Sequence, residues 1–262
     1  MQKGPILIVI LIGVFVLLFA LPSWLSSSDE QKIEVTNDIE LIEIDSAGIN
    51  TIIVPRKQKN IEAELDGKGS VTVKEYRDSI KVEYERKWFQ PFSFNHRKKL
   101  TIYIPESYDR DMEIEVGSGN VSFDGKANAI QLKHLSLEAG SGNIQMESIA
   151  ADKAVIEVHS GNVNIKQFIG QLEADVSSGN LIIEMDHLQG PLSADVSSGQ
   201  LTLKLPKDAD FTLNGQVSSG KISSDIPLKD KIETKDELKG IHGSGEHKIN
   251  LDVSSGRIQI MN

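Results

Sequence analysis

Residues 172–183 read LEADVSSGNLII: alternating apolar residues lead into a Ser-Ser-Gly turn and resume directly after it. This pattern occurs seven times between residues 114 and 260, each time around a glycine that we term the pivot. The pivots are Gly119, Gly142, Gly161, Gly179, Gly199, Gly220 and Gly256. They are separated by 23, 19, 18, 20, 21 and 36 residues. A repeat of about 20 residues predicts a solenoid, in which each rung buries its apolar side against its neighbours.

Apolar residues stand at fixed distances from each pivot, as Val176, Leu181 and Ile183 do around Gly179. Their spacing by two places them on one face of a strand. Glycine suits a sharp corner because it tolerates positive φ. We therefore predict an all-β fold, a single-stranded parallel β-helix or β-solenoid. Each rung of about 20 residues would comprise a strand, a Ser-Gly corner, a second strand and a return loop.

The predicted solenoid domain covers residues 35–262, with regular rungs over 106–262. The part before residue 106 alternates well but lacks the pivot, and we interpret it as irregular first coils of the same solenoid, because terminal repeats are usually atypical. The segment 226–242 lengthens the last repeat. Either it folds over the C-terminal edge, or that edge pairs with another chain, so self-association stays open.

The beginning of the chain predicts a membrane anchor. Residues 6–25 are apolar and uncharged, and Lys3 precedes them. About 20 such residues can cross a bilayer, and the basic flank keeps the N-terminus inside. We expect residues 1–5 in the cytoplasm, a single-pass helix over 6–25, a linker over 26–34 and an extracytoplasmic C-terminal domain in the cell membrane. The alternative is a cleaved signal peptide and a secreted protein.

Composition narrows the possible partners and the sources of stability. The chain is 39% hydrophobic and 25% charged, as expected of a globular protein, and its net charge is −10. This acidity argues against nucleic acid as a partner. The chain has no cysteine, so its stability must come from packing without disulfides.

The stretch 86–99, RKWFQPFSFNHRKK, is the least typical part of the sequence. Basic residues interleaved with aromatic ones suit a membrane interface or an acidic partner. Alternatively, the aromatic residues cap the solenoid and the cations remain solvated. The candidate contact residues are Arg86, Lys87, Trp88, Phe89, Phe92, Phe94, Arg97, Lys98 and Lys99.

A column of acidic residues stands four residues before the pivots. Its members are Glu115, Glu138, Glu157, Asp175 and Asp195, followed by Gln216 and Asp252. In a parallel stack these carboxylates would face outward about 5 Å apart and repel one another. They could recruit a cation or a basic ligand, or simply form a solvated face.

Other polar residues of the repeat have structural explanations. Asn120, Asn143, Asn162 and Asn180 follow successive pivots and predict a ladder of hydrogen-bonded amides. The stretch 215–221 resembles a phosphate-binding loop, but the repeat already explains its Ser and Gly. The sequence therefore predicts no catalytic residue, no metal ligand and no cofactor.

Three copies of the repeat, VSSGNLII, VSSGQLTL and VSSGRIQI, begin at residues 176, 196 and 253. Together with KLTIYIP at 99–105, they resemble a bacterial cell-envelope family labelled "putative adhesin". The apolar N-terminus and the overall length are similar to the membrane-anchored LiaG-like proteins of Gram-positive bacteria. The resemblance implies a β-solenoid, no established catalytic residues and a role beside a system that responds to cell-envelope stress.

We therefore expect a non-enzymatic, membrane-anchored envelope protein, an interaction or scaffold module linked to the stress response. Its partner would be another envelope protein or a wall-associated molecule. A surface adhesin is one alternative. The other is a β-solenoid enzyme acting on polysaccharide, since such enzymes use clustered carboxylates on one sheet face.

Overall fold

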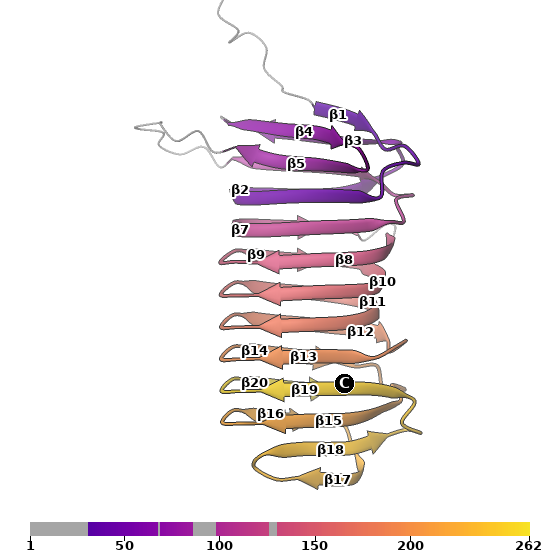
Figure 1. Ribbon diagram of the computed structural model, residues 1–262, viewed down its shortest axis with the longest axis vertical. Helices are drawn as coiled ribbons and strands as arrows, with labels where there is room; N and C mark the ends of the chain where they lie inside the picture. The colour runs from indigo at the N-terminus through magenta and orange to yellow at the C-terminus, as the bar shows by residue number, and fades with distance from the viewer. Residues whose placement is uncertain (1–30, 68, 86–97, 126–129) are drawn as a thin grey trace, which may run out of the picture.

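A computed structural model describes residues 31–67, 69–85, 98–125 and 130–262, and every regular element in these ranges is a strand (Figure 1). The all-β prediction is therefore confirmed for this part of the chain. The predicted helix over 6–25 lies outside it. In the described ranges we find no helix long and apolar enough to span a bilayer. The strands are β1 (Gln31–Glu34), β2 (Leu41–Arg56), β3 (Asn60–Asp66), β4 (Ser70–Tyr76), β5 (Ser79–Glu85), β6 (Lys99–Pro105), β7 (Asp111–Phe123), β8 (Gln131–Ala139), β9 (Asn143–Met146), β10 (Ile149–Val158), β11 (Asn162–Val176), β12 (Asn180–His187), β13 (Leu192–Val196), β14 (Gln200–Lys204), β15 (Phe211–Val217), β16 (Lys221–Ser224), β17 (Lys229–Glu233), β18 (Glu237–His242), β19 (His247–Val253) and β20 (Arg257–Met261).

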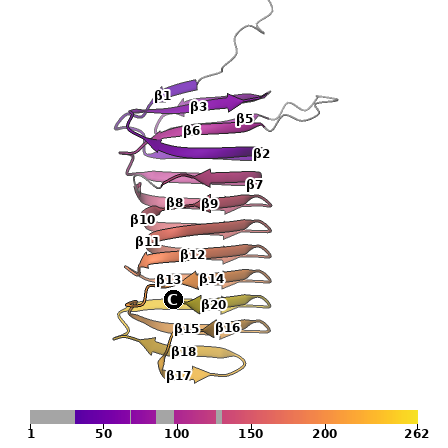
Figure 2. The same ribbon diagram turned by 180° about the vertical axis from the view of Figure 1, so that it is seen from behind.

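The strands stack as two long faces that meet at the Ser-Gly corners (Figures 1 and 2). Face A holds the strand before each corner, and its parallel centre runs through β5, β2, β7, β8, β10, β11, β13, β19 and β15. Face B holds the strand after each corner, and its parallel centre runs through β6, β2, β7, β9, β11, β12, β14, β20 and β16. The long strands β2, β7 and β11 contribute to both faces because they continue around a bend.

The core lies between the two faces and consists of the predicted apolar columns. Val121 pairs with Ile144, which pairs with Val163, and all three side chains are buried. Three phenylalanines, Phe123, Phe168 and Phe211, are the largest fully buried side chains. Alternation by two turned Val121, Ile144, Val163 and Phe123 inward as the sequence predicted, whereas Phe168 and Phe211 lie outside the predicted columns.

The pivot glycines have a different role from the one predicted. Among the seven pivots, only Gly119 has a positive φ, of 99°. At the other six, an added Cβ would lie no more than 2.9 Å from the carbonyl oxygen of the pivot glycine in the adjacent rung. That same carbonyl accepts a backbone hydrogen bond from the next rung, as Gly179 does from Gln200 at 3.0 Å. Glycine is needed at these corners because stacked backbones approach too closely for a side chain.

The N-terminal end is closed by antiparallel strands, so the interpretation of residues 33–105 as irregular first coils holds only for β2, β5 and β6, which pair in parallel. Within this region β2 forms a full rung, parallel to β7. By contrast, β4 pairs antiparallel with β5, and β3 pairs antiparallel with β6 and with β1. The connection between β4 and β5 is only two residues long, and such a short turn permits only antiparallel pairing.

The last rung of the sequence is not the last rung of the stack. β19 lies between β13 and β15, and β20 lies between β14 and β16. The segment 226–242 does fold over an end of the solenoid, but the strand it covers is β15, on which β18 pairs antiparallel. The last strands of the sequence therefore do not form the C-terminal edge that the sequence analysis assumed, because the β17–β18 hairpin carries the chain past β15 and β19 returns inside it.

The outer edge of face A at this end is β17. All five of its side chains are exposed, and two of them are lysines. Its pairing with β18 is irregular, and Asp230 has a positive φ of 49°. Lysines and an irregular backbone are common devices against edge-to-edge association. Pairing with another chain is therefore disfavoured at this edge.

Asp210 fixes the point at which β19 enters the stack. Its carboxylate accepts hydrogen bonds from the Ser244 hydroxyl at 2.7 Å and from the backbone N–H groups of Ser244, Gly245 and Glu246. These bonds favour the ionised form and hold the pKa of Asp210 well below its usual range. The turn before β19 is thus tied to the start of β15.

Candidate functional site

The acidic column forms a continuous row on the outside of face A, which we term the acidic ladder. Its members occupy the same register position on ten adjacent strands and are, in stacking order, Glu83, Asp45, Glu115, Glu138, Glu157, Asp175, Asp195, Asp252, Gln216 and Glu237. Eight carboxylates follow one another before the single glutamine. At about 4.8 Å per strand, the ladder is roughly 43 Å long.

The structure brings the five predicted acidic residues together and adds three that the sequence analysis missed. Asp45, Glu83 and Glu237 belong to strands without a Ser-Gly pivot. Asp45 could have been found, because it stands five residues before Asn50, just as Glu115 stands five residues before Asn120. Glu83 and Glu237 become members only through strand pairing, for which the sequence gives no direct signal.

Burial and the charges of neighbouring carboxylates both act on the pKa values along this row. Burial, followed by the charges of Asp252 and Asp175, raises the pKa of Asp195. Burial, followed by Asp45 and Glu138, raises the pKa of Glu115. Both carboxylates are therefore harder to ionise in the fold than in water, and a cation placed along the ladder would relieve that cost.

A few basic side chains partly offset the charge of face A. His159 lies at the corner next to Glu138, with Nε2 at 3.1 Å from Oε1. Lys153 pairs with Glu173 beside the ladder, at 2.8 Å. Lys81 lowers the pKa of Asp45, although burial has the larger, opposite effect and the net pKa is raised. The ladder itself remains strongly negative.

Stability is expected to increase as the pH falls from neutral to about 4. The pKa values of Asp45, Glu115 and Asp195 are raised, so the folded state binds protons more readily than the unfolded chain. Their ionisation therefore costs stability at neutral pH, and protonation removes that cost. The window stops near pH 4 because Asp210, whose pKa is lowered, contributes stability that is lost in more acidic solution. Urea unfolding at several pH values measures this dependence.

The matched variants for this prediction are Asp195→Asn and Asp152→Asn. The first should raise the free energy of unfolding at neutral pH by roughly 0.2–1 kcal/mol, towards the low end because solvent screens exposed charges. The effect should be smaller near pH 4, where more of the Asp195 carboxyl groups are protonated. Asp152 is exposed and lies outside the ladder, so its variant should change little. Equal effects of the two variants would contradict the role assigned to the ladder.

The other predicted contact region is only partly described. Arg86, Lys87, Trp88, Phe89, Phe92, Phe94 and Arg97 lie outside the described residues. Lys98 donates a hydrogen bond to the Tyr84 hydroxyl at 3.2 Å, and Lys99 is exposed at the start of β6. Lys99 pairs with Asn50 and thus belongs to face B, so it does not adjoin the acidic ladder.

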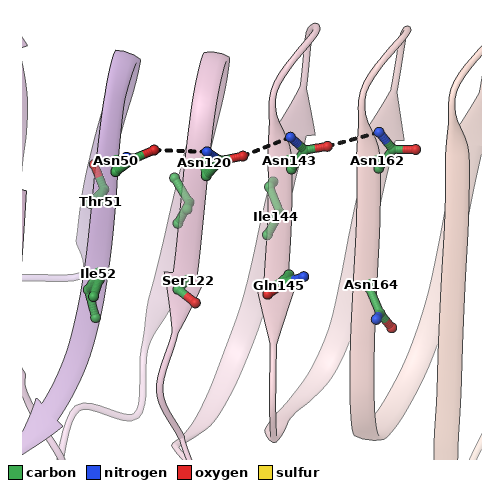
Figure 3. Close-up of a pocket in the computed structure, with 11 residues that line it drawn as sticks. Asn50, Thr51, Ile52, Asn120, Ser122, Asn143, Ile144, Gln145, Asn162 and Asn164 are labelled. Atoms are coloured by element: carbon green, nitrogen blue, oxygen red, sulfur yellow. Dashed lines mark hydrogen bonds between the residues drawn. The ribbon is translucent and has the colours of Figure 1, made fainter. Parts of the chain in front are cut away.

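Face B carries the predicted amide ladder (Figure 3). Asn162 donates to Asn143 at 2.8 Å, Asn143 to Asn120 at 2.7 Å, and Asn120 to Asn50 at 2.8 Å. The ladder therefore includes Asn50, which the sequence analysis missed, and Asn180 occupies the next register position. Beside these amides runs an open groove of about 400 Å³.

The described residues contain no group of three His, Cys, Asp or Glu side chains placed to hold a metal ion. His242 packs near Phe211, and its Nδ1 lies 2.8 Å from the carbonyl oxygen of Pro227. Its local role is structural.

No curated protein matches the chain. Among solved structures, it is similar to a "putative adhesin" from Parabacteroides distasonis, with 13% identity, coverage of 89% of this chain and 96% of that chain, and a TM-score of 0.48. A "putative cell adhesion protein" from Clostridium sporogenes shows 14% identity and a TM-score of 0.41, and the match covers 89% of this chain and 99% of that chain. A "putative lipid binding protein" from Parabacteroides distasonis shows 14% identity and a TM-score of 0.38, and the match covers 90% of this chain and 97% of that chain.

A family model covers nearly all of the solenoid. The family described as Toastrack DUF4097 matches residues 39–132 and 124–261, which together form most of the chain. These ranges contain both faces, all seven pivots and nearly all of the strands described above. The chain therefore belongs to the Toastrack DUF4097 family.

Proposed function

We propose that this chain is a non-enzymatic interaction scaffold of the cell envelope, which holds a basic partner along the acidic ladder. The observation that carries the proposal is the run of eight adjacent carboxylates from Glu83 to Asp252. The solenoid fixes their spacing, so a partner with repeated lysine or arginine side chains can neutralise several at once. Electrostatic complementarity of this kind guides association and selects partners.

The same row supports a binding role over a catalytic one. Acid–base catalysis by two carboxylates depends on environments that move their pKa values apart. Asp45, Glu115 and Asp195 are all shifted in one direction, and burial is the largest cause for each. A ladder of similar groups suits an extended ligand that contacts many positions equally.

The location belongs to the same proposal. Residues 6–25 would anchor the chain as a single-pass helix, with the solenoid outside the cytoplasmic membrane, as in LiaG-like proteins linked to envelope stress. The uncharged apolar sequence supports this placement. The chain should then sediment with membranes, and protease added outside spheroplasts should degrade the solenoid. A chain found only in the soluble cytoplasm would contradict this placement.

Binding of a deca-lysine peptide to the full-length chain tests the acidic ladder. The triple variant Asp175→Asn, Asp195→Asn, Asp252→Asn removes three adjacent charges from the run of eight. We expect about a tenfold or greater loss of affinity, and parent binding that weakens as salt is added. Calorimetric titration measures both effects.

The control triple variant is Asp152→Asn, Asp186→Asn, Asp208→Asn. These three aspartates are exposed and lie outside the ladder, so the net charge changes equally. We expect less than about a threefold effect from this control. Equal losses in the two triple variants would mean that only overall charge matters, and the proposed function would be wrong.

A further inference from the structure

The groove on face B is a second candidate binding surface, chemically distinct from the acidic ladder. One wall is the amide ladder formed by Asn50, Asn120, Asn143 and Asn162 (Figure 3). The other wall is a parallel row two residues further along each strand, formed by Ile52, Ser122, Gln145 and Asn164. The groove therefore runs along the stack axis, across four neighbouring strands, and repeats the asparagine of its first wall on each of them.

The amides of the first wall retain hydrogen-bonding capacity. A primary amide has two N–H donors and an oxygen with two lone pairs. Asn143 uses one donor towards Asn120 and one lone pair towards Asn162, so one of each remains. On the opposite wall, the described structure gives Gln145 and Asn164 no hydrogen-bond partner. Each rung thus offers free donors and acceptors to a ligand in the groove.

The groove carries no formal charge, although the chain as a whole has a net charge of −10. Its eight outward side chains are amides, one hydroxyl and one isoleucine. At the register position of the amide row, the first charged residues along the stack are Lys99 on one side of the groove and Arg257 on the other, and both lie outside the groove. An ionic ligand would lose its hydration here without gaining a counter-charge, so the surface favours a neutral polar ligand.

We propose that this groove binds a linear, uncharged polysaccharide that lies along the stack axis. Sugar hydroxyl groups both donate and accept hydrogen bonds, as the free amide groups require. A linear glycan repeats its polar groups at each sugar, and the groove repeats its own at each strand, about 4.8 Å apart. Several weak hydrogen bonds can then form in register along one chain.

Two other occupants fit the surface less well. An extended peptide adds to a sheet by pairing with an exposed edge, whereas the backbone groups of β7, β9 and β11 already pair with one another here. A second copy of the chain would place one uncharged amide face against another without burying an apolar centre, which stable interfaces usually need. The experiment below distinguishes the second copy directly.

The test is titration of the full-length chain with cellohexaose and with chitohexaose, in a detergent without a sugar headgroup. Saturable binding of either oligosaccharide is expected. The variant Gln145→Ala, Asn164→Ala removes one wall and leaves the bonds of the amide ladder intact. It should weaken binding about tenfold, the expected effect of losing two neutral hydrogen bonds, with an unchanged unfolding midpoint.

The matched control is Thr202→Ala, Gln259→Ala. These residues occupy the same offset from their pivots on β14 and β20, outside the groove, and should leave affinity unchanged. Binding should also be insensitive to salt and to the triple aspartate variant of the acidic ladder, which separates this proposal from the proposed function. The proposal is overturned if neither oligosaccharide binds at millimolar concentration, if the Gln145, Asn164 variant binds as tightly as the parent, or if mass measurement shows that copies of the chain cover the groove.

Discussion

A chain that ends at residue 246 is expected to lose the cooperative fold of the C-terminal half of the solenoid. In most repeat proteins the final repeat of the sequence lies at the end of the stack and contacts only one neighbouring repeat. Here β19 and β20 lie inside the stack, so their removal separates β15 and β16 from the rest. Five inward side chains would be lost, namely Ile249, Leu251, Val253, Ile258 and Ile260. At roughly 1.5–3 kcal/mol each, their burial contributes about as much as the whole stability of a typical domain, roughly 5–15 kcal/mol.

Urea unfolding together with hydrogen exchange measures this effect. We expect the truncated chain to have a much lower midpoint and to lose protection over β15 and β18. The control shortens the β17–β18 hairpin at residues 230–235, all of which are exposed. Shortening this hairpin should lower the urea midpoint only slightly. A truncated chain that unfolds at the parental midpoint would show that β15 docks on β13 without β19 and would contradict the observed order.

The stacking order was not predictable from the sequence because all rungs carry the same columns. Asp195 could pair equally well with the aspartate of any rung, and the structure pairs it with Asp252. The only anomaly was the gap of 36 residues before Gly256. A gap of that length is compatible with an insertion at the end of the stack and with a return inside it. Hydrophobic alternation determines which side chains face inward, and it leaves the order of identical neighbours undetermined.

The antiparallel strands of the N-terminal end were missed for a related reason. Alternation by two looks the same in a parallel and an antiparallel strand, so KLTIYIP at 99–105 gave no direction of pairing. The decisive information is in the turns. Arg77 and Asp78 leave room for only a hairpin between β4 and β5, and this short connection was the available signal.

The candidate site was likewise predictable where a sequence pattern repeats, and not where it depends on strand pairing. Acidic residues at a fixed offset from the pivots predicted the centre of the ladder correctly. Glu83 and Glu237 belong to the ladder only because β5 pairs with β2 and β18 pairs with β15. No local sequence pattern predicts these strand pairings. The amide ladder was predicted from Asn120 to Asn180, but the groove beside it was not. It depends on a second row, formed by Ile52, Ser122, Gln145 and Asn164, whose members share no single residue type.

Gly199→Ala is the point substitution expected to have the largest effect on stability. An added Cβ would lie 2.5 Å from the carbonyl oxygen of Gly179 and 2.6 Å from Cγ1 of Val176. The two rungs would have to separate locally, which would weaken the hydrogen bond from Gln200 to Gly179. Overpacking of this kind costs about 1–3 kcal/mol. Urea unfolding should show the loss, whereas Ser198→Ala, in the same corner but exposed, should change stability by less than about 0.5 kcal/mol.

Asparagine at the same position distinguishes the two explanations for a corner glycine. If glycine were needed for a left-handed backbone, Gly199→Asn would be partly tolerated, because asparagine adopts that conformation more readily than alanine. Gly199 has no positive φ, and its neighbour is a backbone carbonyl that cannot rotate away. We therefore expect Gly199→Asn to be at least as destabilising as Gly199→Ala. Rescue by asparagine would mean that the corner, and not the contact between rungs, selects the glycine.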